Sequence, residues 1–260
     1  MRLLSRTKAS LLQSLFVAAF LAVPALSAAD NTDVAGKELR LIELFTSHGC
    51  SSCPAADRLL GKLLEQDESL VALEYHVDYW NSLVHGNAGN FVDPFSQPGF
   101  TQRQREYSAA GLAGRPGVYT PQIIVNGRVA MVGSDKRYLA KVLSRKSMSS
   151  LQIILSPLLA SPDRLQVEIS ASEEQRRRLS GMDIVLVKYQ DQGITKITGG
   201  ENLNLQLVNR HIVRKVIRLG EVNLNGPITY EIASPAEGHG CVVMVQEGAS
   251  SPVHAAVACP

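Results

Sequence analysis

Apolar and polar residues follow strand spacing and helix spacing in turn over the first half of the chain, up to about residue 147. The runs Glu38–Thr46 and Leu70–Val77 predict strands, and Cys53–Glu68 between them carries leucines at helical spacing. Asn81–Gly99 is rich in Asn, Gly and Pro and predicts a long loop. These residues therefore predict a strand–helix–strand unit followed by an irregular segment.

The same half continues with a helix, a hairpin and a last helix. Thr101 and Gln104 have the spacing of a capping box and predict the start of a helix. Two short apolar runs flank Asn126 and Gly127, which tolerate the positive φ angles of a type I′ hairpin turn. A helix over 134–143 follows, so the predicted order is β-α-β-α-β-β-α.

The second half contains short strand-like runs separated by polar turns. Their spacing predicts an antiparallel β-sandwich. We therefore expect a leader over 1–29, an α/β domain over 30–147 and an all-β, sandwich-like domain over 148–260. The strand-like runs are Leu151–Leu155, Arg164–Ser170, Ile184–Tyr189, His211–Leu219, Ile228–Ile232, Cys241–Gln246 and Val253–Ala258.

The first 29 residues have the three-part pattern of a secretory signal peptide. A basic start precedes an uncharged stretch from Ala9 to Ala29, and Ser27 and Ala29 fit the small-residue rule for cleavage before Asp30. An uncleaved membrane anchor is the alternative, although Pro24 interrupts the apolar stretch. We expect export to an oxidising compartment, the bacterial periplasm, with no stable membrane span after cleavage.

Composition excludes two classes of protein. Of 260 residues, 45% are hydrophobic and 19% are charged, which argues against a disordered chain. Without the leader, 23 basic residues face 24 acidic ones, so the net charge is about −1. A nearly neutral body gives no electrostatic basis for binding nucleic acid, and we expect no such partner.

The motif that carries chemistry is Cys50-Ser51-Ser52-Cys53, which lies between a predicted strand and a predicted helix. Free amide donors and the helix dipole at a helix N-terminus stabilise a thiolate. The two-residue spacing lets Cys53 attack a mixed disulfide formed at Cys50. We therefore expect an exposed Cys50 as nucleophile and Cys53 as resolving thiol, with no cofactor and no metal.

Other candidates follow the ends of the predicted strands, where the sites of open α/β sheets gather. Asp78 is expected at the wall of the site, or alternatively as a cap of the following loop. Trp80 is expected to line a substrate groove or to pack beneath that loop. At Thr120-Pro121, a cis proline would pass beside the cysteines and position the Thr120 backbone for a bound peptide; a trans proline is the alternative.

Five further polar residues each allow two interpretations. His48 and His76 could assist the thiols by charge or proton transfer, or His48 could be a solvated loop residue. Glu43 could be a buried proton acceptor, but pairing with a base or facing outward is favoured. Arg103 and Arg105 are expected on a helix surface rather than at a substrate.

The chain resembles, in four segments, the exported thioredoxin-like family named domain of unknown function 1223. These segments are ELFTSHGCSSCPAAD, HVDYW, DPFSQPGF-TQRQREY and VYTPQIIVNG, with a weaker resemblance through Gly199-Gly200-Glu201-Asn202. The resemblance implies a thioredoxin-like fold, the cysteine pair at the active-site position and a cis Pro121. Because the two serines replace the Gly-Pro pair of thioredoxin, the direction of electron flow stays open.

The last two cysteines predict a structural disulfide. If the final two strands form a hairpin with Glu247 opposite Val253, Cys241 falls opposite Cys259. Directly opposed Cβ atoms lie about 4.5–5.5 Å apart, close enough for a disulfide after a small adjustment. Two free buried thiols are the alternative, which an oxidising compartment disfavours.

Three functions are compatible with the sequence. The favoured one is an exported thiol–disulfide oxidoreductase that exchanges disulfides with protein or small-molecule thiols through Cys50 and Cys53. The second is a metal-binding module in which these cysteines, with His48 or His76, hold copper or zinc. The third is a non-catalytic thioredoxin-like binding protein in which the pair is a closed disulfide.

Overall fold

The computed structural model describes residues 38–83, 91–112, 117–248 and 251–260. All of them belong to one compact unit, Val34–Pro260. The signal peptide predicted over 1–29 lies outside the described residues, as does its cleavage site before Asp30. None of the described helices has both the length and the apolar composition of a transmembrane helix.

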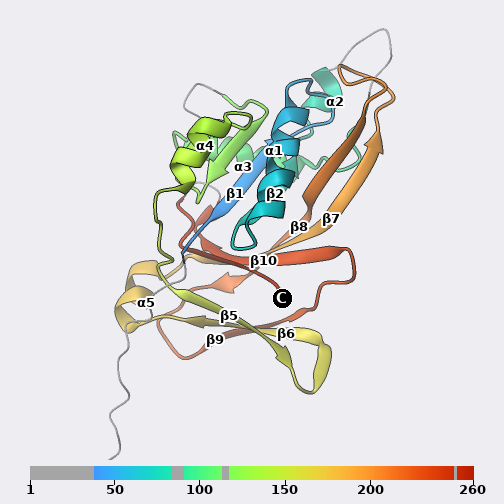
Figure 1. The fold of residues 1–260 in the computed structure, drawn as a ribbon. Helices are drawn as coiled ribbons and strands as arrows, with labels where there is room; N and C mark the ends of the chain where they lie inside the picture. Colours follow the sequence, from blue (N-terminus) through green and yellow to red (C-terminus); the bar gives the residue numbers. More distant parts are fainter. Residues whose placement is uncertain (1–37, 84–90, 113–116, 249–250) are drawn as a thin grey trace, which may run out of the picture. The chain divides into compact units, whose positions relative to one another are not determined.

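A mixed, eight-stranded sheet carries the fold (Figure 1), with the strand order β11-β10-β7-β8-β2-β1-β3-β4. β1 pairs in parallel with β2 and antiparallel with β3, and β3 and β4 form the predicted hairpin. Asn126 (φ 52°) and Gly127 (φ 61°) occupy its turn, as a type I′ turn requires. The strands are β1 (Leu41–Thr46), β2 (Val71–His76), β3 (Gln122–Val125), β4 (Val129–Val132), β7 (Asp183–Lys196), β8 (Gln206–Glu221), β10 (His239–Gln246) and β11 (Ala255–Ala258).

Helices cover both faces of β1, which explains why its residues are all buried. Ile42 and Leu44 enter an apolar cluster with α1 and α4. Leu41 and Phe45 point to the opposite face, into a cluster that contains residues of α3. The helices are α1 (Cys53–Gln66), α2 (Trp80–Leu83), α3 (Pro98–Ala109), α4 (Lys136–Leu143) and α5 (Glu173–Leu179).

A second, three-stranded sheet has the order β5-β6-β9 and consists of β5 (Gln152–Leu158), β6 (Ser161–Ser170) and β9 (Ile228–Ala233). Its apolar face packs against the β7–β10–β11 part of the large sheet, where Val167 shares a cluster with Leu186 and Val243. All seven strands predicted for the second half are present. Four of them join the large sheet, so the boundary expected after residue 147 separates strands of one sheet.

The predicted capping box at Thr101 is wrong. α3 begins three residues earlier, at Pro98, which suits a first helical position because it lacks an N–H group. The Thr101 hydroxyl bonds Asp78 instead, and Gln104 Nε2 donates to the backbone oxygen of Tyr119 at 2.6 Å. Both side chains therefore fix the position of α3 relative to neighbouring segments instead of capping it.

Candidate functional site

A disulfide joins Cys50 and Cys53 between the end of β1 and the start of α1, with a Cα–Cα distance of 5.4 Å. Cys53 is the first residue of α1, and its N–H donates to the Cys50 carbonyl at 3.1 Å. Ser52 is the N-cap residue but makes no side-chain cap bond; its Oγ lies 3.3 Å from Cys50 Sγ. The helix N-terminus therefore keeps amide donors without a side-chain acceptor beside the cysteine pair.

The expected exposure of Cys50 is wrong, because the residue is only 1% exposed and Cys53 is fully buried. The turn between β7 and β8 lies against this segment. Asn202 Nδ2 donates to the carbonyls of His48 (2.8 Å) and Cys50 (2.9 Å). Ser51 N donates to Glu201 Oε2 at 2.9 Å. Sequence reasoning missed this contact because about 150 residues separate its partners.

The two disulfides of the molecule lie in different surroundings. Cys241 and Cys259 are joined with a Cα–Cα distance of 5.2 Å, in the register extrapolated from the sequence. This bond belongs to the apolar cluster between the two sheets. Among the described residues, no apolar cluster includes Cys50 or Cys53. The chain therefore packs one disulfide in its core and holds the other beneath hydrogen-bonded polar groups.

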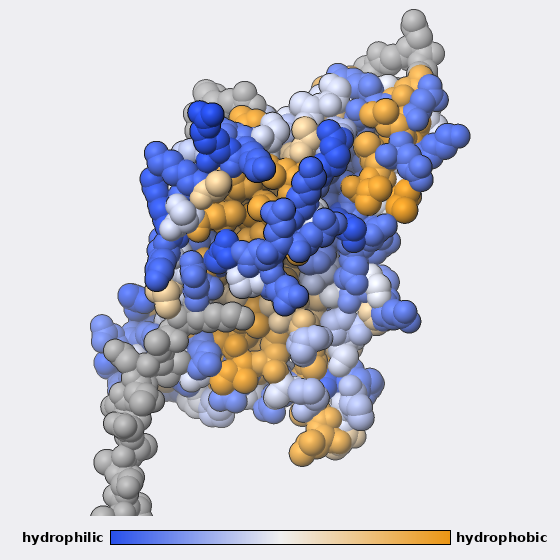
Figure 2. Space-filling view, in the orientation of Figure 1, coloured by the Kyte–Doolittle hydropathy of each residue, from blue (hydrophilic) through white to orange (hydrophobic). Residues whose placement is uncertain are grey.

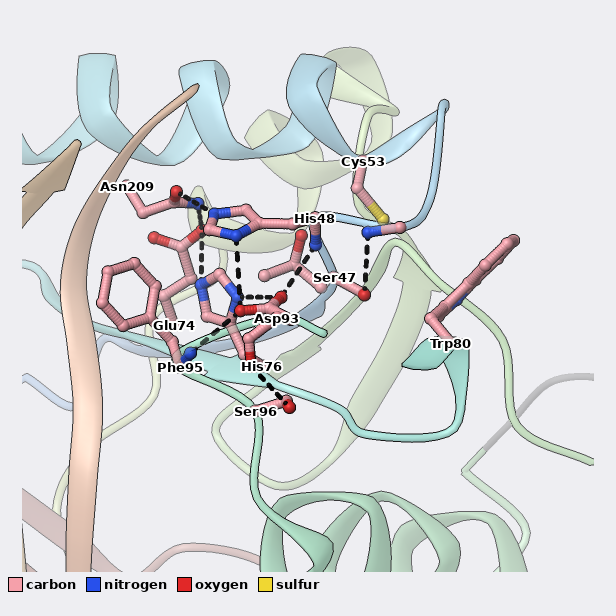
Figure 3. A network of polar contacts seen from close by, with 12 residues as sticks. Ser47, His48, Cys53, Glu74, His76, Trp80, Asp93, Phe95, Ser96 and Asn209 are labelled. Atoms are coloured by element: carbon pink, nitrogen blue, oxygen red, sulfur yellow. Dashed lines mark hydrogen bonds and ion pairs between the residues drawn. The ribbon is translucent and has the colours of Figure 1, made fainter. Parts of the chain in front are cut away.

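Two histidines and an aspartate lie behind the cysteine segment (Figure 3). The carboxylate of Asp93 lies between the two imidazoles, 2.7 Å from His76 Nδ1 and 3.3 Å from His48 Nδ1. It also accepts the backbone N–H of His48 at 2.8 Å. The ring of Phe95 packs against both histidines, with centroid distances of 5.5 and 5.3 Å. All three polar side chains are buried, so the interpretation of His48 as a solvated residue is wrong.

The charges of this group follow from its contacts. Burial and the neighbouring His76 lower the pKa of His48. Burial also acts to lower the pKa of His76, but the charge and hydrogen bond of Asp93 outweigh it and raise this pKa. Burial of Asp93 opposes its ionisation, but the charge and hydrogen bond of His76 hold the pKa of this carboxyl well below its usual range. The arrangement is an ion pair of Asp93 with His76, beside a neutral His48.

One protein family and two solved structures match this chain over most of its length. Residues 41–246 match the family described as protein of unknown function (DUF1223). The chain belongs to this family. A crystal structure of an Agrobacterium tumefaciens protein is similar, with a TM-score of 0.65 and 26% identity over 85% of this chain and 95% of that one.

A second solved structure, HBP35 of Porphyromonas gingivalis, has a TM-score of 0.50 and 16% identity over 86% of this chain and 76% of that one. This likeness concerns the fold alone. No curated protein matches the sequence. The comparisons therefore give the DUF1223 family and its fold, and the chemistry has to be argued from the site.

The DUF1223 chain also buries two carboxyl groups near the cysteines, at Asp57 and Glu74. Asp57 lies one helical turn after Cys53 and accepts a hydrogen bond from Thr46 Oγ1 at 2.7 Å. Burial, and then the neighbouring Glu74, raises the pKa of Asp57 well above its usual value. Glu74 instead accepts from Asn209 Nδ2 and Arg210 N, so the proton of the pair resides on Asp57.

Sequence reasoning missed Asp57, although a signal for it exists. It falls between Cys53, Ala56 and Leu60 on the helix face that the leucine spacing buries. A cavity of about 110 Å³ lies against it, lined by Pro54, Asp57, Arg58, Gln206, Leu207 and Val208. Asp57 therefore borders a space between α1 and β8 at the level of the first helical turn.

The residues proposed as site walls have definite partners. Asp78 bonds Thr101 of α3: its carboxylate accepts from the Thr101 hydroxyl, and its backbone N–H donates to the same oxygen. Trp80 is half-buried, and its Nε1 donates to Thr120 Oγ1 at 2.7 Å. The Thr120-Pro121 bond is cis.

Pro121 packs near the start of α1. A Cβ atom added at Gly133 would lie 3.0 Å from Pro121 Cβ and 3.1 Å from Ala56 Cβ, so Gly133 lies between these two residues. Ala56 is three residues after Cys53. Trp80, Thr120 and Pro121 therefore form a connected group, and its proline is near the helix turn that carries Cys53.

Glu43 and Arg103 form a separate buried network. Arg103 Nε donates to Glu43 Oε1 at 2.7 Å and its NH2 group donates to Gln246 Oε1 at 2.8 Å. The favoured pairing of Glu43 with a base is therefore observed, but the expected surface position of Arg103 is wrong. Arg105 is exposed, as expected. This network joins β1, α3 and β10 and does not include the cysteines.

Proposed function

We propose that this chain is an exported thiol–disulfide oxidoreductase that acts through Cys50 and Cys53. A thiolate of the partner attacks Cys50 Sγ and displaces Cys53 as a thiolate, which gives a mixed disulfide. A second partner thiol then releases Cys50, so the partner becomes a disulfide and the protein a dithiol. The reverse sequence oxidises the protein and reduces the partner, with no organic cofactor in either direction.

The observation that carries the proposal is the position of the cysteine pair at the N-terminus of α1. The first turn of α1 has no side-chain cap and no acidic residue in that turn. The positive end of the α1 dipole therefore stabilises a thiolate, which makes Cys50 or Cys53 a better leaving group. The contrast with Cys241–Cys259, which is packed among apolar side chains, supports an exchangeable role for one bond and a structural role for the other.

The arrangement of the first half supports a thioredoxin-like fold. Parallel β1 and β2, antiparallel β3 and β4, and helices on both faces of β1 have the order expected from the sequence. The cis Thr120-Pro121 bond and the place of the cysteines after β1 agree with the resemblance to that superfamily. The leader sequence and two disulfides in one chain support export to an oxidising compartment.

Exchange requires that the turn between β7 and β8 moves away from Cys50. The contacts that hold this turn at residues 48–51 are hydrogen bonds of Asn202 and Glu201, which water can replace when the turn opens. Four exposed apolar side chains lie on the same hairpin: Ile194, Leu203, Leu205 and Val208. Figure 2 shows apolar surface over the ends of β7 and β8 that are uppermost in Figure 1. This surface favours a protein partner over a small thiol.

Asp57 is suited to donate a proton to Cys53 when this residue is displaced as a thiolate. Burial, and then the neighbouring Glu74, raises the pKa of Asp57 and keeps this carboxyl protonated, and helix spacing places it on the same face as Cys53. The cavity beside it gives the proton a short path towards solvent. We infer that Asp57 keeps the charge of the buried site balanced when the disulfide is reduced.

The test is to trap the mixed disulfide. In a Cys53→Ser variant, produced with its leader in a bacterial host, Cys50 cannot be released by its neighbour and is expected to hold partner proteins in disulfide-linked complexes. Non-reducing electrophoresis and mass spectrometry identify the complexes. The Cys50→Ser/Cys53→Ser double variant is the control and is expected to form none.

One result would reject the oxidoreductase. If Cys53→Ser forms no mixed disulfide while its Cys50 reacts with an alkylating reagent, the thiol is accessible and nevertheless takes part in no exchange. The cysteine pair would then be a closed disulfide of a binding protein.

A further inference from the structure

The group formed by His48, His76 and Asp93 has the composition of a metal site and is not used by the proposed redox chemistry. The three side chains come from the loop after β1, the end of β2 and the segment before α3. One donor atom from each lies within 4.8 Å of the others. The side chains of both histidines are fully buried.

Hydrogen bonds fix which nitrogen of His48 carries its proton. Asn209 Nδ2 donates to Glu74 Oε1 at 2.6 Å, so the amide oxygen of Asn209 is the atom that faces His48 Nε2 at 2.8 Å. Nε2 must therefore be the N–H donor, and a neutral His48 has its lone pair on Nδ1. That lone pair faces Asp93 Oδ1 at 3.3 Å, and His48 Nδ1 has no hydrogen-bond partner.

Two acceptors that face each other in a buried place require a positive charge between or beside them. Without a metal, the ion pair of His76 with Asp93 supplies that charge, and a metal ion takes its place by displacing the proton from His76 Nδ1. The separation of 3.3 Å between Nδ1 and Oδ1 matches the edge of a tetrahedron whose centre lies about 2.0–2.1 Å from each ligand atom. A metal ion of that size can contact both atoms, and the hydrogen-bond distance of 2.7 Å between His76 Nδ1 and Asp93 Oδ2 lengthens when the ion replaces the proton.

His76 also directs one ring nitrogen to Asp93 and the other to a second polar side chain. Its Nδ1 faces the other oxygen of Asp93, and its Nε2 is 3.7 Å from Glu74 Oε1 without a hydrogen-bond partner. If Nδ1 is a ligand, Nε2 carries the proton and points to the Glu74 carboxylate. Metal-bound histidines commonly direct their outer N–H to a carboxylate or a carbonyl in this way.

We propose that His48 Nδ1, His76 Nδ1 and the Asp93 carboxylate bind a divalent transition-metal ion of the Zn²⁺ type. Asn209 and Glu74 are the outer partners that orient the two imidazoles. Two imidazoles and one carboxylate suit zinc and leave one of four positions for another ligand. The cysteines are not ligands, which separates this site from a thiolate metal module at Cys50 and Cys53.

The probe is Co²⁺, which replaces Zn²⁺ and has a visible spectrum that reports its ligands. The protein, freed of metal by a chelator, is titrated with Co²⁺ and then with Zn²⁺ as competitor. We expect one equivalent to bind with visible absorption and no sulfur-to-cobalt charge-transfer band. Binding is expected to persist in the Cys50→Ser/Cys53→Ser variant, so that failure of this proposal is distinguishable from failure of the redox function.

Variants test the ligand and its outer partner separately. Asp93→Asn is expected to weaken Co²⁺ binding at least 100-fold, and Glu74→Gln by about 10–100-fold. His239→Ala changes an exposed histidine and is the matched control, with unchanged affinity. Circular dichroism checks that each variant is folded. X-ray absorption of the Zn²⁺-loaded wild type needs no variant and is expected to show nitrogen and oxygen ligands only.

Three results would overturn the proposal. The first is that the wild type binds neither Co²⁺ nor Zn²⁺, which would mean that a proton alone balances the charge between His48 and Asp93. The second is loss of binding in the double cysteine variant, or sulfur in the X-ray absorption spectrum. The third is an affinity of Asp93→Asn equal to that of His239→Ala.

Discussion

Replacing Asp57 tests its protonation. The folded chain keeps a proton on this buried carboxyl that the unfolded chain releases above the ordinary aspartate pKa of about 3.9. The contribution of Asp57 to the free energy of unfolding therefore falls as pH rises above about 4, by up to about 1.4 kcal/mol per pH unit until the folded group ionises. Asp57→Asn removes this loss and keeps the hydrogen bond from Thr46.

Urea unfolding of Asp57→Asn and wild type at pH 4 and pH 7 measures the effect. We expect the variant to gain stability relative to wild type as pH rises. Asp163→Asn, at an exposed aspartate, is the control without such a trend. A stability difference between Asp57→Asn and wild type that is the same at both pH values would show that Asp57 is ionised in the folded chain.

Asp57 shows how far single residues of the site could be predicted. The Cys50 and Cys53 pair is visible in the sequence because its spacing is local and specific. Asp57 is also local, but a lone aspartate in a helix normally faces solvent, and only its phase relative to Ala56 and Leu60 indicates burial. Asp93 comes from an irregular segment whose course no periodicity describes.

The β7–β8 hairpin is the element that the sequence described least well. The strands were expected at Ile184–Tyr189 and His211–Leu219, but β7 extends to Lys196 and β8 begins at Gln206. The extension is half-exposed and its residues alternate weakly between apolar and polar, so it carries little strand signal. The turn between β7 and β8 holds Asn202 against the cysteine segment, and no local sequence pattern predicts this contact.

The position of this turn predicts that it controls access to the disulfide. Asn202→Ala removes hydrogen bonds to the His48 and Cys50 carbonyls, each worth about 1 kcal/mol, which favours the open turn. We expect dithiothreitol to reduce Cys50–Cys53 roughly 5–30-fold faster in Asn202→Ala than in wild type. Alkylation and mass spectrometry at timed intervals measure the rate for each disulfide.

The control for the turn is Glu237→Gln, which changes an exposed residue in the loop before β10. It is expected to leave the reduction rate unchanged, and Cys241–Cys259 is an internal reference in every sample. Equal rates for Asn202→Ala and wild type would mean that the turn does not limit access. Equal acceleration of both disulfides would mean that Asn202→Ala unfolds the whole chain.

At the scale of the whole molecule, the sequence predicted which segments form strands better than how the strands associate. Apart from the short α2, which falls at the start of the segment expected as a loop, the order of elements in the first half agrees with the sequence, and so do the seven strands of the second. The two halves of the chain meet in the large sheet where β2 pairs in parallel with β8, at a single residue pair, Glu74 and Ile212. Apolar periodicity identifies strands but holds no information on which strand lies beside which, so this pairing could not be predicted from the sequence.

One disulfide is packed in the core at the β10–β11 edge of the large sheet, and the other lies beyond the end of β1 beneath polar groups. This difference is the basis of the proposed function. The most direct test is a redox titration of the wild type in glutathione and dithiothreitol buffers, with alkylation and mass spectrometry of each cysteine pair. We expect Cys50–Cys53 to titrate reversibly at a potential more oxidising than about −300 mV while Cys241–Cys259 stays oxidised. Resistance of Cys50–Cys53 to reduction below that potential, together with Cys241–Cys259, would contradict a role in thiol–disulfide exchange.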